Sequence, residues 1–143
     1  MSWKIFQRWF NCPPTTNSEY ITDKSGEKFW ISWGSYFDLG LFLYVSYRGK
    51  WVGTVESYWK ENGGLELTDI VIFEQFSYLR HRNLGKKMIR YLIERAKKEG
   101  RRYIQGIIIA HDGSSNEYLN EWYQRQGFQV DGGSIYLALQ DNQ

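Results

Sequence analysis

The sequence is poor in cysteine, in proline and in net charge: its 143 residues include one cysteine and two prolines, and the formal net charge is +2. Because Cys12 has no second cysteine to bond with, an intramolecular disulfide is excluded, and no Cys/His cluster has zinc-binding spacing. These features favour a reducing compartment. The N-terminal apolar residues are interrupted by Lys4 and Arg8, so we expect no signal peptide, no membrane span and a cytoplasmic location.

The composition narrows the class of protein further. A small net charge and an isoelectric point near 8.6 argue against a nucleic-acid-binding protein, which usually carries a concentrated basic face. Hydrophobic and charged contents of 42% and 24% are ordinary for a globular protein and exclude disorder and fibrous structure. The length fits a single domain over residues 1–143. Aromatic residues reach 18%, which indicates a core or a pocket built from large flat side chains.

A helix is predicted over residues 78–100, and its beginning is unusually basic. Its apolar stripe, at helical spacing, consists of Leu84, Met88, Ile89, Leu92, Ile93 and Ala96. A helix N-terminus carries about half a positive charge and favours acids, yet this one holds Arg80, His81, Arg82, Lys86 and Lys87. Two interpretations stay open: an external anion bound by backbone N–H groups and flanking cations, or long basic side chains extended into water at small cost.

A second predicted helix, which ends before Gly127, follows the dipole rule. It has Glu117 in its first turn and Arg125 near its end, and Ser114, Ser115 and Asn116 are its candidate caps. Because this helix is ordinary, the basic beginning of the first helix is a property of that segment and not of the whole chain.

The remaining segments predict strands. Hairpins are expected over residues 19–33, 41–59 and 128–139, and single strands over residues 65–76 and 103–109. The continuous β-branched run in 103–109 is typical of a strand buried on both faces. A strand, the basic helix and this strand form a βαβ unit, which should be parallel with a right-handed crossover. We therefore predict an α/β fold: a mixed, mostly antiparallel sheet with a central parallel βαβ unit and flanking helices.

Two motifs in this order resemble the GCN5-related N-acetyltransferase (GNAT) family. The family's pyrophosphate loop, Q/R-x-x-G-x-G/A, is similar to "RHRNLG", which matches at Arg80 and Gly85 and has Asn83 in place of the first glycine. Asparagine is the non-glycine residue that best tolerates left-handed backbone angles. The family's N-x-x-A-x-x-x-Y-x-x-x-G-F motif resembles "NEYLNEWYQRQGF", which keeps Asn116 and Tyr123 but has Leu119 in place of the alanine.

The resemblance implies an N-acetyltransferase whose co-substrate is acetyl-CoA, with no metal. The anion at the basic helix would then be the pyrophosphate, and the pantetheine arm would pair with main-chain groups at the end of the central strand. The implied cofactor-binding residues are Phe73, Gln75, Arg80, His81, Arg82, Asn83, Leu84, Gly85, Lys86 and Asn116. The alternative role for Asn116 is that of a helix cap.

The resemblance also suggests catalytic residues. Acetyl transfer from a thioester needs a neutral amine and a proton for the departing thiolate. Tyr123 corresponds to the family's proton donor, although it could pack as an ordinary aromatic residue. Asp69 lies where some members have a glutamate base, with Glu66 and Glu56 as alternatives, and any of these acids could simply be solvated. His111 reads as a surface loop residue.

The acceptor is not specified by the sequence beyond a small-molecule or peptide amine. Residues 1–40 form an atypical N-terminal region, too short and strand-like for the two helices that line the family's acceptor site. Trp30, Trp33, Tyr36 and Phe37 suit either a pocket for a cationic amine or the core. A homodimer stays open, nucleic-acid and membrane partners are not expected, and the alternative function is a non-catalytic acyl-CoA-binding or regulatory module on the same fold.

Overall fold

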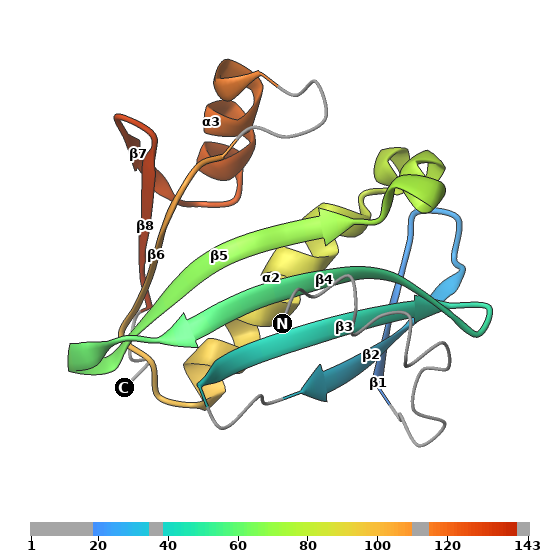
Figure 1. Cartoon of the computed structure of the whole chain (residues 1–143), viewed down its shortest axis with the longest axis horizontal. Helices are drawn as coiled ribbons and strands as arrows, with labels where there is room; N and C mark the ends of the chain where they lie inside the picture. The colour runs from blue at the N-terminus through green and yellow to red at the C-terminus, as the bar shows by residue number, and fades with distance from the viewer. Residues whose placement is uncertain (1–18, 35–38, 110–114, 140–143) are drawn as a thin grey trace.

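The computed structural model describes residues 19–34, 39–109 and 115–139, apart from the side chains of Glu74, Ser77, Arg80 and His81, and these residues form one eight-stranded sheet (Figure 1). The strands are β1 (Glu19–Thr22), β2 (Lys28–Gly34), β3 (Gly40–Tyr47), β4 (Lys50–Trp59), β5 (Gly64–Ile72), β6 (Tyr103–Ile107), β7 (Gln129–Asp131) and β8 (Ser134–Ala138). Their spatial order is β1-β2-β3-β4-β5-β6-β8-β7, and only the β5–β6 pair is parallel. The predicted fold class is confirmed.

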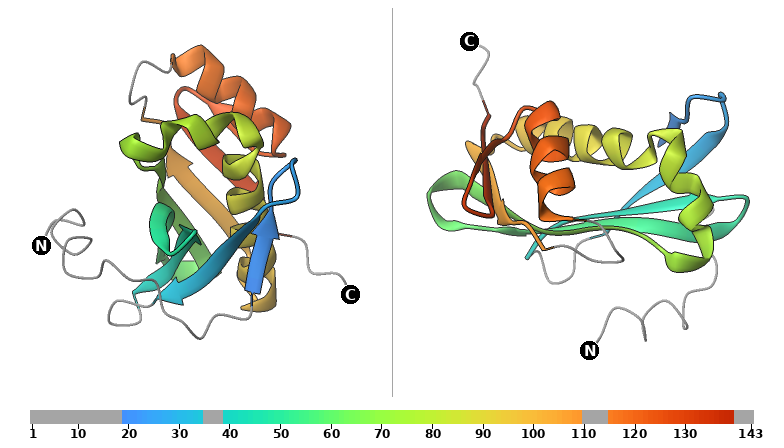
Figure 2. Two further views of the ribbon diagram at one scale, coloured as in Figure 1. Left: turned by 90° about the vertical axis from the view of Figure 1, so that its right-hand side faces the viewer. Right: turned by 90° about the horizontal axis from the view of Figure 1, so that it is seen from above.

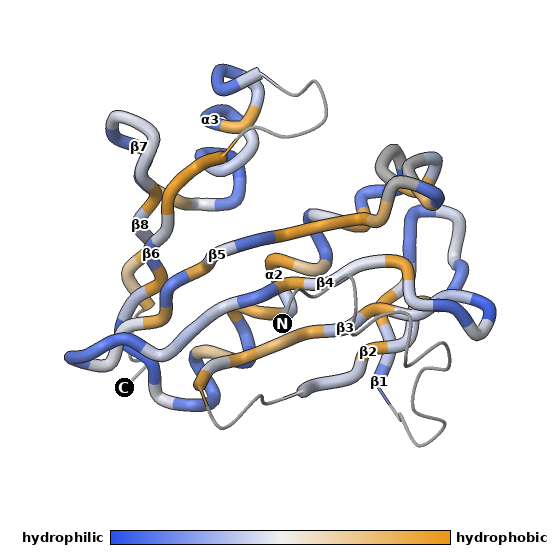
Figure 3. The backbone as a smooth tube through the Cα atoms, viewed as in Figure 1, coloured by the Kyte–Doolittle hydropathy of each residue, from blue (hydrophilic) through white to orange (hydrophobic). Residues whose placement is uncertain are grey.

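Helix α2 (Leu84–Lys98) lies along one face of the sheet (Figure 2). All six side chains of its predicted apolar stripe are buried. They belong to a core whose sheet members include Leu43, Val45, Val55, Leu65 and Ile104, none with exposed surface. Figure 3 shows the matching apolar stretches along β3, β5 and β6. Since each buried Leu or Ile contributes about 1.5–3 kcal/mol, this packing fixes the position of α2.

Strands β5 and β6 pair over a short length and then diverge. The ladder joins residues 64–67 to residues 103–106, whereas β5 continues to Ile72. A Cβ atom on Gly106 would lie 2.5 Å from the Leu67 carbonyl oxygen, so only glycine allows the two backbones to approach at the last pair. Beyond it, β5 leads to the beginning of α2 and β6 leads toward α3 (Asn116–Arg125), as Figure 1 shows.

Two predicted strand ends are wrong. β5 ends at Ile72 and does not reach Phe76, because residues Glu74–Arg82 form a 3-10 helix, η2, and α2 itself begins only at Leu84. β6 ends at Ile107, and its end is not buried on both faces, since Ile107 and Ile109 are 68% and 58% exposed. The β-branched run does not reveal that β6 has already separated from β5 there.

The turns agree with their sequence signals. Arg48 and Gly49, at φ angles of 51° and 78°, form the two-residue turn between β3 and β4. α3 is capped by Ser115, whose side chain accepts a hydrogen bond of 3.0 Å from the Tyr118 N–H. The chain passes from β2 to β3 through residues 35–39 alone, too few to form two helices. Residues 1–18, Tyr36, Phe37 and His111 lie outside the described residues.

Candidate active site

The beginning of α2 presents backbone N–H groups that have no partner within the helix. Asn83 precedes the helix with φ 61° and ψ 22°, so the prediction that this asparagine takes the left-handed conformation is confirmed. The first turn has neither a side-chain cap nor an acid. The Lys87 N–H already bonds the Asn83 carbonyl at 3.1 Å, whereas the N–H groups of residues 84–86 come too early in α2 to bond a carbonyl of the same helix. These N–H groups, with the positive end of the helix dipole, can hold an anion.

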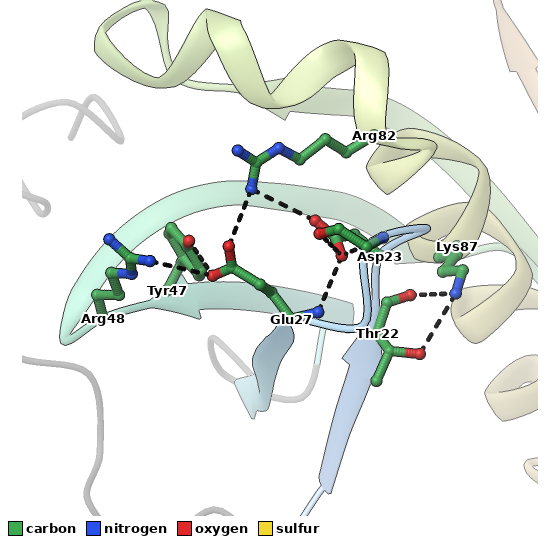
Figure 4. Close-up of polar contacts among 8 residues, drawn as sticks. Thr22, Asp23, Glu27, Tyr47, Arg48, Arg82 and Lys87 are labelled. Atoms are coloured by element: carbon green, nitrogen blue, oxygen red, sulfur yellow. Dashed lines mark hydrogen bonds and ion pairs between the residues drawn. The ribbon is translucent and has the colours of Figure 1, made fainter.

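The basic side chains around this turn have different environments (Figure 4). Arg82 forms ion pairs with Asp23 at 3.4 Å and Glu27 at 3.5 Å, both in the turn between β1 and β2. Lys87 donates to the carbonyl oxygen of Thr22. Lys86, in contrast, is exposed and has no ion pair with any described residue. Part of the positive charge is therefore neutralised within the chain, an arrangement that neither sequence-based interpretation included.

Asp23 and Glu27 were missed by the sequence analysis. The signal was present in "TDKSGE", because an aspartate that opens a turn commonly accepts hydrogen bonds from the backbone two residues on. The Asp23 carboxylate is fully buried and accepts bonds from the Ser25 N–H at 2.9 Å and the Glu27 N–H at 3.0 Å. Burial alone would raise the pKa of Asp23, but the hydrogen bonds from Ser25 and Glu27 and the charge of Arg82 lower it below its ordinary value.

Tyr123 extends from α3 toward the sheet. Its ring packs edge-on against Trp122 and Phe128, at centroid distances of 5.0 and 5.6 Å. Burial and the negative charge of Asp69 raise the pKa of Tyr123 to about 12, so the hydroxyl stays protonated at neutral pH. The structure thus brings Tyr123 and Asp69, from separate sequence motifs, within electrostatic range of each other.

Asp69 and Glu56 lie side by side on adjacent strands. They are register partners between β5 and β4, next to a bulge at Glu56. Because Val55 points into the core, its neighbour Glu56 faces the side of the sheet opposite α2. Burial and the charge of Asp69 raise the pKa of Glu56. Tyr44 and Tyr58 surround the same carboxylate, and burial together with the charge of Glu56 raises their pKa values.

One family model matches most of the chain. The description of the matching family model is acetyltransferase (GNAT) family, and the match covers residues 3–128. The chain belongs to the GNAT family. Across the part of the chain that the structure describes, no helix is long and apolar enough to cross a membrane, and no group of three or more His, Cys, Asp or Glu residues is placed to hold a metal ion.

Solved GNAT structures share this fold at low sequence identity. A Bacillus subtilis acetyltransferase in complex with CoA has a TM-score of 0.60 at 19% identity, over 79% of this chain and 100% of that chain. An aminoglycoside 6'-N-acetyltransferase complexed with coenzyme A has a TM-score of 0.58 at 13% identity, over 72% and 74%. The ribosomal-protein-S18-alanine N-acetyltransferase from Escherichia coli has a TM-score of 0.58 at 16% identity, over 72% and 71%. No curated protein matches the sequence.

The remaining predicted GNAT site residues occupy varied positions. At the end of β5, the Phe73 N–H donates to the Val52 carbonyl at 2.9 Å, and the Phe73 carbonyl accepts from the Phe76 N–H. A pantetheine arm that pairs with Phe73 would therefore bond to the second lone pair of this carbonyl oxygen. Gln75 is exposed. Asn116 is the exposed first residue of α3, and the cap is Ser115, so the alternative role of Asn116 as the cap is wrong.

The aromatic residues of β2 divide between core and surface. Trp33 stacks on Tyr91 of α2 at a centroid distance of 5.8 Å, and the Arg95 guanidinium lies 4.9 Å from the Trp33 ring, so Trp33 joins the sheet to the helix. Trp30 is 36% exposed and packs edge-on against Tyr20. Trp33 therefore has a packing role while it is only partly buried, and Trp30 is the more exposed of the pair.

Gly85→Glu is predicted to abolish acetyl-CoA binding, because a carboxylate beside the α2 N–H groups would repel the pyrophosphate. Gly85→Ala is the matched control, since an added Cβ would meet only a Trp122 ring atom at an ordinary 3.6 Å. Acetyl-CoA should raise the Tm of the wild type and of Gly85→Ala, because a ligand at 100-fold its Kd stabilises the folded state by about 2.7 kcal/mol. Acetyl-CoA should not change the Tm of Gly85→Glu.

Gly85→Gln adds similar bulk without charge. Comparison of its Tm shift with that of Gly85→Glu separates steric exclusion of the pyrophosphate from electrostatic repulsion. A Gly85→Glu variant with the wild-type Tm shift would show that the anion binds elsewhere. The absence of any shift in the wild type at millimolar acetyl-CoA would contradict cofactor binding altogether.

Proposed function

We propose that the protein is an acetyl-CoA-dependent N-acetyltransferase that acetylates a primary amine of a small-molecule or peptide acceptor. One observation carries the proposal: α2 begins with an uncapped, acid-free first turn, which can hold the anionic part of acetyl-CoA. The negative charge of Asp69 of β5 raises the pKa of Tyr123 of α3, which supports a pairing of a candidate base with a protonated candidate acid. Membership in the GNAT family and the CoA complexes of two solved relatives of the same fold support the reaction class.

The beginning of α2 suits the anionic part of the co-substrate. Bound acetyl-CoA would supply the thioester whose acetyl group is transferred. The N–H groups of residues 84–86 would hold its pyrophosphate, and the exposed Lys86 side chain would add a positive charge. A Cβ atom added at Gly85 would meet a Trp122 ring atom at 3.6 Å, an ordinary contact, so the backbone here is not tightly covered. The residues present therefore fit a diphosphate.

The carboxylate pair, Glu56 and Asp69, would receive the amine. A protonated amine is attracted to two adjacent carboxylates, and it must lose a proton before its nitrogen can attack a carbonyl carbon. A raised pKa makes Glu56 a stronger base than an ordinary glutamate. We assign proton removal to this pair. Asp69 would be the member closer to acetyl-CoA, because it lies on β5, in the part beyond Leu67 where β5 has separated from β6 and its edge can pair with the cofactor. Glu66 forms an ion pair with Lys60 at 3.9 Å and is the weaker candidate.

Tyr123 would return a proton to the sulfur. When the carbon–sulfur bond breaks, its electron pair stays on sulfur, and protonation of the thiolate by the phenol prevents the reverse reaction. Because the pKa of Tyr123 is about 12, the phenol carries its proton throughout the neutral range. The packing of its ring between Trp122 and Phe128 holds the hydroxyl in one place.

Turnover of a panel of primary amines with acetyl-CoA, followed through the released thiol, tests the proposed function. At least one amine is expected to give thiol release above the hydrolysis rate, together with the N-acetylated product by mass spectrometry. A protein that binds acetyl-CoA but turns over no amine in a broad panel would instead be a non-catalytic acyl-CoA-binding module.

Tyr123→Phe is predicted to lower the single-turnover rate roughly 10² to 10⁴-fold, as expected for a lost general acid. The ring and its contacts remain, so stability should fall by only about 0.5 to 1.5 kcal/mol and acetyl-CoA affinity should stay near the wild-type value. Single-turnover rates are needed because product release can mask the chemical step. A Phe variant with the wild-type rate would assign Tyr123 to packing alone.

Asp69→Asn is predicted to lower the single-turnover rate roughly 10² to 10⁴-fold, and Glu66→Gln, the matched control on the same strand, should leave it unchanged.

Activity should fall as the pH drops through the raised pKa of Glu56, above its ordinary 4.5, because a protonated carboxyl cannot accept the amine's proton. An active Asp69→Asn variant whose acidic limb shifts to lower pH would make Glu56 the base, since that variant lowers the pKa of Glu56.

A further inference from the structure

The turn between β1 and β2, residues 23–27, contacts the beginning of α2 although nearly 60 residues separate them in sequence (Figure 4). Arg82, directly before Asn83, forms ion pairs with Asp23 and Glu27. Lys87, one helical turn further on, donates to the Thr22 carbonyl and lies 3.5 Å from the Thr22 hydroxyl. The two contacts therefore lie on either side of residues 83–86, which carry the backbone donors for the anion.

Asp23 is held rigidly by its own turn. Its Oδ1 accepts hydrogen bonds from the Ser25 N–H, the Ser25 hydroxyl at 2.6 Å and the Glu27 N–H, and its backbone N–H donates to the Glu27 carbonyl at 3.0 Å. Its other oxygen, Oδ2, faces Arg82. A fully buried carboxylate of this kind is costly without charged or hydrogen-bonded partners. The turn thus presents one fixed acceptor to Arg82.

Glu27 holds Arg82 from a second direction. Its Oε1 faces Arg82 at 3.5 Å, while its Oε2 accepts from the Tyr47 hydroxyl and pairs with Arg48 at 3.4 Å. Tyr47 is buried and stacks on Phe29 at 4.6 Å, which ties Glu27 to the core. Arg48 is 75% exposed at its side chain, so its ion pair with Glu27 is the outermost part of the network.

Asn83 needs such support. A non-glycine residue with positive φ is uncommon and is maintained by the surrounding structure. Arg82 and Lys87 are anchored on the same turn, one before Asn83 and one after it, and the stretch between them contains the left-handed residue and the first helical N–H groups.

We propose that the β1–β2 turn positions the anion-binding beginning of α2, with Asp23 as a positioning residue for acetyl-CoA. The inference rests on the proposed function, because it presumes that acetyl-CoA binds there. Arg82 and Lys87 are bonded to the β1–β2 turn, whereas Lys86, between them, has no ion pair with any residue that the structure describes. The hairpin of β1 and β2 thereby acquires a role in cofactor binding.

Asp23→Asn provides a test, because a positioning role and simple electrostatics predict opposite changes in the affinity for acetyl-CoA. The substitution removes a negative charge near the anion site, so long-range electrostatics alone would tighten acetyl-CoA binding. Loss of positioning should weaken it by about tenfold. Calorimetry at fixed salt should show this loss, with a raised KM for acetyl-CoA and an unchanged single-turnover rate at saturating acetyl-CoA. Arg48→Gln, which removes the exposed ion pair with Glu27 and the cation–π contact with Tyr47 but leaves Asp23 and Arg82 in place, should stay within about twofold of the wild type.

A double-mutant cycle identifies the route. If Asp23 acts through Arg82, then Asp23→Asn combined with Arg82→Gln should bind acetyl-CoA no more weakly than Arg82→Gln alone. Should Asp23→Asn fail to fold, Lys87→Gln removes the second anchor and should weaken affinity by a similar factor.

Unchanged or tighter binding in the folded variants, with normal binding by the wild type, would overturn the positioning role. The same holds if Arg82→Gln weakens binding while Asp23→Asn does not, because Arg82 would then contact the cofactor directly. A wild type that does not bind acetyl-CoA would instead refute the proposed function on which this inference rests.

Discussion

The packing of α2 against the sheet is the interaction on which the rest of the structure depends. The buried stripe of the helix fixes its direction and register, and this places an uncapped, acid-free helix beginning beyond the end of β5. The hydrophobic effect depends on the apolar area that is buried and not on nearby charges. The buried stripe can therefore keep α2 in place although the basic residues in its first turn are electrostatically unfavourable there. The positive end that results is available for an anion.

Charge is distributed unevenly over the two faces of the sheet. Positive charge gathers at the beginning of α2, and the carboxylate pair lies on the opposite face, on β4 and β5. An anionic co-substrate and a cationic amine would thus approach different parts of the protein. The negative charge of Asp69 also acts on Tyr123 of α3 and raises its pKa. Such a separation allows both ligands to bind without competing for the same charges.

The sequence predicted local features well and long-range ones poorly. Hairpin turns, the capped α3 and the left-handed Asn83 depend on a few neighbouring residues, and each was visible in the sequence. The exposed end of β6 was not visible, because the separation of β6 from β5 is a property of the sheet. The pairing of Arg82 with Asp23 joins residues 59 positions apart, and no local pattern reveals which basic residue is neutralised within the chain. Among Arg82, Lys86 and Lys87, whose side chains the structure describes, Lys86 is the one that keeps its charge exposed, as the sequence suggested.

Hydrogen–deuterium exchange with and without acetyl-CoA tests the central claim, that the beginning of α2 is the anion site. Bound acetyl-CoA should slow amide exchange in residues 83–87 and in the adjoining end of β5, residues 68–73. Residues 134–138 of β8, which pairs with β6 and β7 and not with β5, should show little change and serve as the internal reference. Protection confined to other segments, with binding confirmed by calorimetry, would contradict the account.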